Sequence, residues 1–416
     1  MENSDHHSSR TIFDPIHGHV TFSSKIWTFI DNPVFQRLRN VKQLGTSNYV
    51  FPGATHSRFE HCLGVGYLSR KLLATIKKKQ PELEISENDL TNITLAGIMH
   101  DLGHGPFSHV FDAEVVPALG IHNWTHEEAS VSLLRYMIDT YNLDIEQEDI
   151  RKVSNYITGA GCGFMDQIVN NRLNSIDVDK YDYIKRDCYC LGFREFPLDI
   201  DRLMKNSKVI DDTICYHEKV VHSVYSLFQN RFSLFQQCYS HRVEQSIGLM
   251  FTDAIVAAES VLNIKERIAD PALYYQVTDN IINEIMITKD SQLDSAKEII
   301  NRIQRRNLYK LAGELIYPAD VSIQNITREN IVSYNPTSEP LSVDDIIVKP
   351  FTLTYGNPAD RVWFYKGDSK FLIPREKVST LIPGNYCDKY VRVFVRNPEK
   401  QEVAKKAFEA FCQKER

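Results

Sequence analysis

The segment Ile98-Met99-His100-Asp101-Leu102-Gly103-His104-Gly105-Pro106-Phe107-Ser108-His109 decides the fold, because an apolar helical run ends there in a His-Asp doublet. The run before the doublet has apolar residues at helical spacing: Leu90, Ile93, Leu95, Ile98 and Met99. The glycines and the proline that follow predict that the helix stops. An imidazole and a carboxylate buried together need partners, and a divalent cation suits both. A single His-Asp pair is common by chance, so this interpretation depends on the rest of the chain.

The bulk composition indicates an ordinary globular protein. Of the 416 residues, 43% are hydrophobic and 25% are charged, and the net charge of −6 argues against nucleic acid or an anionic membrane as the main partner. The eight cysteines form no CxxC pair, which favours reduced thiols in an intracellular protein. The polar N-terminus and the lack of a long apolar run predict that the protein is not secreted, has no transmembrane segment and resides in the cytoplasm, the nucleus or both.

The order of patterns along the chain predicts a mostly helical protein with a small C-terminal α+β lobe. Residues 1–9 read as a disordered tail, and Asp14–His19 as a turn-rich opening. Helices are expected from Ser24, from Pro33, from Ser57 to Lys79, from Ser86 to the doublet, over Trp124–Met137, over Ile176–Asp187, and over Val220–Phe235, His241–Leu262, Asp279–Ile287 and Leu293–Lys310. In the helix from Pro33, Gln36, Arg37, Arg39 and Lys42 are assigned to the polar face. Strands are expected at Phe351–Tyr355, Val362–Tyr365, Lys370–Ile373 and Tyr390–Val395, before a closing helix at Glu402–Cys412.

Four residues form a candidate metal set: His61 on one helix, His100 and Asp101 on a second and Asp179 on a third. Two imidazoles and two carboxylates without a thiolate suit Fe, Mn or Zn and leave coordination positions open. Each histidine taken alone is more often a helix cap or a pocket edge. Their sequence surroundings, however, match a known pattern.

That pattern is the H…HD…D signature of HD-domain phosphohydrolases. The chain resembles, more closely, the deoxynucleoside triphosphate triphosphohydrolases that include the vertebrate SAM- and HD-domain enzyme. The motifs that carry the resemblance are Asp14-Pro-Ile-His-Gly-His, Phe35-Gln-Arg-Leu-Arg, Lys42-Gln-Leu-Gly, the stretch from Val50 to His61, the stretch from His100 to His109, Trp124-Thr-His-Glu and Ile176-Asp-Val-Asp-Lys-Tyr-Asp-Tyr. The resemblance runs from about residue 10 to 412, so no SAM domain is expected. It implies an HD-domain catalytic core at 10–315 and a regulatory or oligomerisation lobe at 316–416.

The resemblance implies a reaction: dNTP and water give a deoxynucleoside and inorganic triphosphate. Arg58, His104, His126, Lys180 and Arg231 would bind phosphates, His109 supported by Asp112 would donate a proton, and Glu127 would orient His126. Gln43 and Asp187 would bind the 3′-hydroxyl, and Leu44, Tyr183 and Tyr239 would pack on the sugar and exclude a 2′-hydroxyl. Phe235, Gln236, Gln237 and Ser240 depart from the family at the base end, and Tyr189 and Cys190 replace a family His-His pair, so the preferred base stays open.

The resemblance also implies control by nucleotides between subunits. GTP or dGTP would occupy a first site at Arg10, Asp31, Gln36 and Arg39, and a dNTP with Mg²⁺ a second site at Val50, Phe51, Arg202, Lys219, His241, Arg242, Arg306, Lys310 and Arg396. Thr11, Phe13 and Gln237 differ from the family pattern at these sites. A homo-oligomer, from dimer to tetramer, is therefore expected.

Three other functions stay open. Another HD phosphohydrolase would act on a guanosine tetraphosphate alarmone, a cyclic nucleotide or a nucleoside monophosphate, for which Gln43, Asp187 and Tyr239 would have no evident purpose. A nucleic-acid sensor is disfavoured by the acidic balance. A pseudoenzyme scaffold is disfavoured by the intact ligand set.

Overall fold

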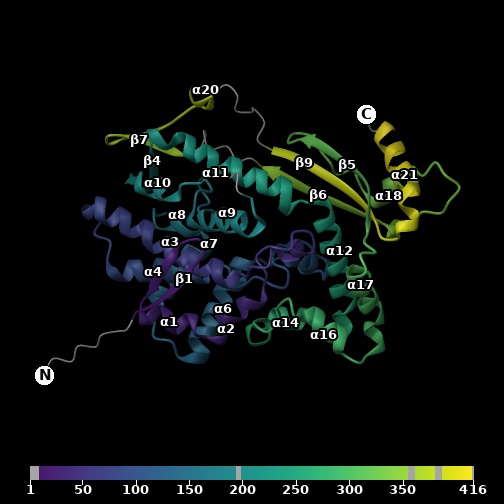
Figure 1. Cartoon of the computed structure of the whole chain (residues 1–416), viewed down its shortest axis with the longest axis horizontal. Coiled ribbons are helices and arrows are strands. Elements are labelled where there is room, and N and C mark those ends of the chain that lie inside the picture. The colour runs from purple at the N-terminus through teal and green to yellow at the C-terminus, as the bar shows by residue number, and fades with distance from the viewer. Residues whose placement is uncertain (1–8, 194–197, 355–360, 380–386, 415–416) are drawn as a thin grey trace.

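The structure is a computed structural model that describes residues 9–193, 198–354, 361–379 and 387–414. Most of the predicted tail, and the end of the strand expected at Phe351–Tyr355, fall outside these ranges. The protein is mostly helical, as the sequence predicts, with three small sheets (Figure 1). None of the helices in the described ranges is both long and apolar enough to cross a membrane.

The helical body is built around α3 (Arg58–Lys79), which packs against α4 (Glu87–Met99) and α9 (Val178–Leu191). Capping boxes at Ser57 and Ser86 start the first two helices where the sequence predicts. The other helices of the body are α1 (Ser24–Ile30), α2 (Pro33–Gln36), α5 (Val116–Ala118), α6 (His126–Tyr141), α7 (Gln147–Thr158), α8 (Asp166–Val169), α10 (Ile200–Lys205), α11 (Val221–Leu234), α12 (Arg242–Ala257), α13 (Glu259–Leu262), α14 (Ile264–Ala269), α15 (Pro271–Tyr274), α16 (Ile281–Ile287) and α17 (Asp294–Gln304). Shorter turns include η1 (Arg37–Asn40), η2 (Gly45–Tyr49) and two π-helical segments, η4 (Phe111–Val115) and η6 (Phe235–Tyr239).

Two hairpins lie where the sequence predicts only turns or helix. β1 (Arg10–Asp14) pairs with β2 (Gly18–Phe22), and β3 (Ser207–Ile210) pairs with β4 (Thr213–His217). The second turn consists of Asp211 and Asp212, both with positive φ, a conformation that suits a two-residue hairpin and that aspartate tolerates. β7 (Trp363–Lys366) and β8 (Ser369–Leu372) extend this hairpin into a four-stranded sheet.

The third sheet has the order β5-β9-β6, with β5 at Lys310–Pro318, β9 at Cys387–Val395 and β6 at Ile346–Thr354. One face, including Ile347 and Phe394, packs on the helical body. The other face, including Val393 and Val395, packs on α18 (Arg328–Ser333) and α21 (Gln401–Lys414), which Figure 1 shows beside the sheet. A short α20 (Arg375–Val378) follows β8. The predicted division at residue 315 falls inside β5, and the role of residues 316–416 stays a prediction.

Two local predictions are wrong. The helix expected to run to Lys310 ends at Gln304, because Arg306 turns the chain with a positive φ before β5 begins. Arg37 is buried rather than on a polar face: its guanidinium donates to the carbonyls of Leu102, His104, Tyr275 and Val277. The arginine therefore fixes the loop that follows the His-Asp doublet.

Candidate metal and substrate site

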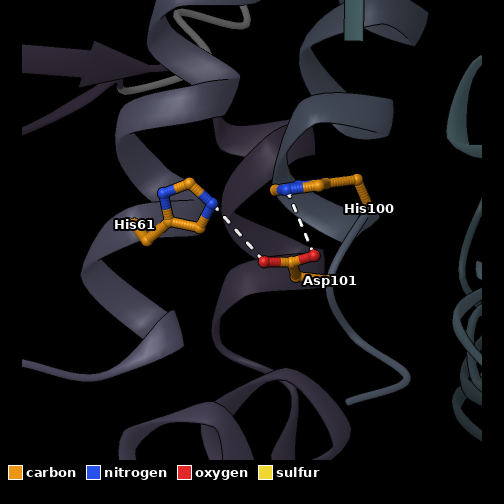
Figure 2. A group of neighbouring side chains, drawn as sticks. All are labelled: His61, His100 and Asp101. Carbon is orange, nitrogen blue, oxygen red and sulfur yellow. Dashed lines mark ion pairs between the residues drawn. The ribbon is translucent and has the colours of Figure 1, made fainter. Parts of the chain in front are cut away.

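The four predicted metal ligands meet at one point. α3 contributes His61, the end of α4 contributes His100 and Asp101, and the start of α9 contributes Asp179. His61 Nε2 lies 3.4 Å from Asp101 Oδ2 and 3.0 Å from Asp179 Oδ1, and His100 Nε2 lies 3.3 Å from Asp101 Oδ1 and 3.5 Å from Asp179 Oδ1. Figure 2 shows the two imidazoles turned toward the Asp101 carboxylate from neighbouring helices. Residues far apart in sequence thus form one His/Asp cluster.

The hydrogen bonds around the cluster leave its donor atoms free. His100 Nδ1 bonds the Gly97 carbonyl at 2.9 Å, and His61 Nδ1 bonds Asp182 Oδ2 at 2.7 Å, so each ring carries its proton away from the cluster. Both Nε2 atoms are buried, and among the described residues neither has a hydrogen-bond partner. Buried imidazole lone pairs that face carboxylates fit a divalent cation, since a cation would satisfy all of them.

A second layer of charges holds His61 in place. Asp182 accepts from His61, from His17 Nε2 at 2.6 Å and from Arg186 at 2.8 Å, and Arg186 reaches Asp14 at 2.9 Å. Gly64 of α3 makes room for this network, since a Cβ there would lie 2.0 Å from Asp182 Oδ1. These supporting residues were not predicted from the sequence. The available signals were the Asp14-Pro-Ile-His-Gly-His motif and the spacing of Asp182 and Arg186 along α9.

A cationic group adjoins the His/Asp cluster. Arg58 is buried: it ion-pairs with Asp101 and donates to Ser108 Oγ at 2.8 Å. In the described part of the chain, its Nη2 has no hydrogen-bond partner. His104 Nε2 lies 3.4 Å from Asp101 Oδ1. Burial, with the charges of Arg58 and His126, lowers the pKa of His104 to about 4, which keeps the imidazole neutral.

Asp112 lies among three imidazoles. Its Oδ2 is 2.9 Å from His126 Nδ1, 3.2 Å from His104 Nδ1 and 3.8 Å from His109 Nδ1. The rings of His104 and His126 stack at 3.9 Å, whereas the side chain of His109 is 76% exposed. Glu127 Oε1 lies 3.6 Å from His126 Nε2. Asp112 therefore lies closer to His126 than to His109, the predicted proton donor.

Two of the predicted sugar-binding residues, Asp187 and Tyr239, are in contact. Tyr239 donates to Asp187 Oδ2, and His56 Nε2 bonds Asp187 Oδ1 at 2.7 Å. Burial on its own would lower the pKa of His56, but contact with Asp187 raises it to about 9; the sequence analysis missed this histidine. Gln43 is buried, and its Oε1 lacks a hydrogen-bond partner within the described ranges. Leu44 immediately precedes η2.

The remaining predicted phosphate and base contacts lie on α9, on α11 and in or just after η6. Lys180 ion-pairs with Asp177 at 3.2 Å and is electrostatically coupled to Tyr183 and Arg231. Arg231 donates to the Thr354 carbonyl at 3.0 Å and lies over the Phe235 ring. At the base end, Gln236, Gln237 and Tyr189 are exposed, Cys190 is half-buried and contacts His56, and the Ser240 hydroxyl bonds the Phe235 carbonyl at 2.5 Å.

The predicted effector residues form contacts on the surface. Arg10 ion-pairs with Asp31, Gln36 donates to the Ile30 carbonyl at 2.7 Å, and Arg39 donates to Gln36 Oε1 at 2.8 Å. In the second set, the rings of Phe51, which follows Val50, and His241 have centroids 5.8 Å apart. Arg306 donates to the Tyr49 carbonyl at 3.0 Å, and Arg202 donates to the Lys219 carbonyl at 3.4 Å. Arg396 ion-pairs with Asp253 at 2.8 Å. Arg242 is exposed at the start of α12, and Lys310 opens β5 opposite Val395.

Comparison with known proteins identifies relatives of this chain. Residues 58–160 match the HD domain family, and residues 198–335 match the HD associated region. The chain is 40% identical to the deoxynucleoside triphosphate triphosphohydrolase SAMHD1 homolog of Dictyostelium discoideum, over 96% of this chain and 80% of that protein. It is 37% identical to SAMHD1 of Bos taurus (97% and 78%) and 36% identical to SAMHD1 of Homo sapiens (97% and 73%).

Proposed function

Because this chain belongs to the family of SAMHD1 deoxynucleoside triphosphate triphosphohydrolases, we propose that it hydrolyses dNTPs to a deoxynucleoside and inorganic triphosphate. The observation that carries the proposal is the pair of buried Nε2 atoms of His61 and His100, which face Asp101 and Asp179 and have no hydrogen-bond partner in the described part of the chain. A cation site of this composition, beside buried cationic groups, suits an anionic substrate such as a triphosphate.

His61, His100, Asp101 and Asp179 would hold the metal, which we propose is Fe, Mn or Zn. When bound, such a cation acts as a Lewis acid that makes water a stronger nucleophile and offsets phosphate charge. Asp182 keeps the His61 proton on Nδ1, and the Gly97 carbonyl does the same for His100. These bonds keep both Nε2 lone pairs directed at the site.

The chain's own cations would position the triphosphate. Arg58 offers its unpartnered Nη2 next to Asp101, so a phosphate oxygen near the metal would complete its hydrogen bonds. Lys180 and Arg231 would bind the phosphates farther from the ligands. His104, held neutral by burial, would donate one N–H to a phosphate oxygen rather than add a charge.

A proton is needed on the departing 5′-oxygen, and the imidazoles around Asp112 are the candidates. His109 is the predicted donor and is the more exposed, so it is open to a substrate. His126 is closer to Asp112; burial opposes the change, but this contact raises the pKa of His126, and Glu127 would help to orient it. Asp112 would stabilise the imidazolium in either case. Comparing His109→Gln with His126→Gln identifies the donor, since only loss of the donor removes the basic limb of the pH profile.

Selection of the deoxyribose would come from the group around Asp187. Gln43 and Asp187 would bind the 3′-hydroxyl, and Tyr239, held by Asp187, would lie with Tyr183 and Leu44 where a 2′-hydroxyl would otherwise fit. The unpartnered Gln43 Oε1 supports this role, because a substrate hydroxyl could donate to it.

Regulation is proposed in the same terms. GTP or dGTP would bind at Arg10, Asp31, Gln36 and Arg39, and a dNTP with Mg²⁺ at the second set. Both would promote a dimer or tetramer. The contacts of Arg10 with Asp31 and of Arg39 with Gln36 support the first site, because they prearrange its polar groups on one surface.

The test is to incubate purified protein of known metal content with each dNTP, with and without GTP, and to identify the products by chromatography. Deoxynucleoside and triphosphate should appear, and Asp179→Ala should abolish them. Asp139→Ala, an exposed aspartate on α6, is the matched control and should retain activity. No turnover of any dNTP by fully metallated protein would refute the proposal and favour alarmone or cyclic nucleotide substrates. Turnover that needs GTP would support the effector sites.

A further inference from the structure

Three charged side chains form a row on the face of the sheet β5-β9-β6 that lies against the helical body. Glu314 of β5 is paired in register with Arg392 of β9, and Arg392 is paired with Lys349 of β6. Because side chains alternate between the faces of a sheet, Lys349 lies on the same face as Ile347, and Arg392 on the same face as Phe394. Both of these apolar neighbours pack on the helical body. The row is therefore at the contact between the sheet and the body.

Lys349 makes an ion pair with Glu114 of η4. The side chains are only 19% and 21% exposed, so water screens the pair weakly. Burial lowers the pKa of the Lys349 ammonium to about 8, so the ammonium stays mostly protonated at neutral pH and can pair with Glu114.

Arg392 makes an equivalent contact next to η6. Its guanidinium donates to the carbonyl of Ser240, the residue that follows η6, and to Gln245 Oε1 of α12 at 2.9 Å. Glu314 ion-pairs with the same guanidinium, and the ring of Phe351 lies 4.9 Å from it. Glu314 thus balances the charge of Arg392 within the sheet, while the N–H groups of Arg392 bind the helical body at Ser240 and Gln245.

Lys349 contacts a π-helical segment and Arg392 contacts the residue that directly follows one, and both segments carry proposed site residues. η4 contains Asp112, and η6 ends at Tyr239. π-Helical turns are rare because their backbone geometry is less favourable than that of an α-helix, so they depend on contacts from outside. Lys349 and Arg392 stand on paired strands, so a displacement of the sheet would reach both segments together.

We propose that Lys349 and Arg392 are positioning residues, through which the C-terminal sheet holds the two π-helical turns that carry Asp112 and Tyr239. Lys349 acts on the proton-transfer group through η4. Arg392 acts on sugar binding through η6. The inference rests on the proposed dNTP hydrolysis for its kinetic consequence, but its structural part can be measured without activity.

Charge reversal of the Lys349–Glu114 pair is the direct test. Lys349→Glu and Glu114→Lys each place like charges together, and the double variant restores an opposite pair with the charges exchanged. Each single variant should lower kcat about tenfold or more with little change in KM, because Asp112 is displaced, and the double variant should recover most of the loss. Arg392→Gln should instead raise KM for the dNTP, because Tyr239 is displaced.

Lys208→Glu is the matched control. Lys208 pairs with Asp368 at 2.6 Å, so it also joins the body to the C-terminal segment, but the two side chains are 28% and 98% exposed. This variant should keep wild-type kcat and KM. Melting temperatures are recorded for every variant, and Lys349→Gln replaces the reversal if Lys349→Glu does not fold.

Hydrogen–deuterium exchange separates this proposal from the proposed function. Amides of residues 107–119 should exchange faster in Lys349→Glu and return to the wild-type rate in the double variant, even if the protein turns over no dNTP. If the wild-type protein turns over no dNTP, this result would refute the proposed function and the kinetic part of this proposal, but not its structural part. Unchanged exchange in the single variants, or a double variant no better than either single one, would overturn the proposal.

Discussion

Substitution of Glu244 by glutamine should make the protein more stable at neutral and alkaline pH, but not in acid. Glu244 is only 7% exposed on α12, and a single hydroxyl, that of Thr46, donates to its Oε1 at 2.7 Å. Burial is the main influence and raises the pKa of this carboxyl from 4.5 to about 7, although Thr46 and Arg392 oppose the rise. Glutamine has nearly the same shape and still accepts from Thr46, but it carries no charge to desolvate.

The sign follows from proton linkage. Between pH 4.5 and about 7 the unfolded chain releases a proton that the folded chain keeps, so Glu244 makes the free energy of unfolding fall as the pH rises. Above pH 7 the whole penalty is present. Since one unit of pKa difference is worth about 1.4 kcal/mol, this penalty amounts to roughly 3 kcal/mol.

The assay is thermal or urea unfolding of wild type and Glu244→Gln between pH 5 and 8.5 at constant ionic strength. The two proteins should differ by no more than about 1 kcal/mol at pH 5, and the variant should become progressively more stable up to about pH 7.5. Glu298→Gln, an exposed glutamate on α17, is the control and should follow the wild type at each pH. Parallel curves for wild type and Glu244→Gln, or a variant less stable at pH 8, would refute the reasoning.

Three further substitutions test the supports of the site. Asp182→Asn should weaken metal binding about 10- to 100-fold, since it removes the carboxylate that accepts from His61. Competition with a chelator measures the affinity, and an unchanged affinity would mean that Asp182 does not support the metal ligands. Gly97→Ala should lower stability by about 1–3 kcal/mol, because its Cβ would lie 2.4 Å from Ser69 Oγ and 3.0 Å from the Gly66 backbone where α3 crosses α4; an unchanged melting temperature would mean that the helices separate easily. Arg37→Met should cost at least about 3 kcal/mol, because it removes the hydrogen-bond donor from four carbonyls; a urea midpoint equal to that of the wild type would contradict this.

Local signals predicted the parts of the fold that depend on neighbouring residues. Ser57 and Ser86 mark the starts of α3 and α4, where they form capping boxes, and the glycines after the His-Asp doublet indicate the end of α4. The alternating residues around Tyr390–Val395 indicate a strand, which the structure contains as β9. These features follow from interactions within a few positions of the chain.

The features that sequence reasoning missed depend on contacts between distant segments. By its sequence position Arg37 looks like a solvated arginine on a short helix. It is buried because distant segments, around residues 102 and 277, place their carbonyls against its guanidinium. Asp182 and Arg186 look like a common i, i+4 surface pair until the β1–β2 turn places His17 beside them. The short strands β3 and β4 lie in a helical context and are held by β7 from the other end of the chain. The roles given to the candidate site residues remain predictions.

The dispersal of the metal cluster along the chain has a consequence for biosynthesis. His61, His100, Asp101 and Asp179 are brought together only when α9 packs on α3, so no segment that leaves the ribosome early contains a complete set of donors. A cation held by all four residues would therefore bind tightly only after at least the first half of the polypeptide has been made and has folded. Which cation enters would then depend on the ions available at that stage.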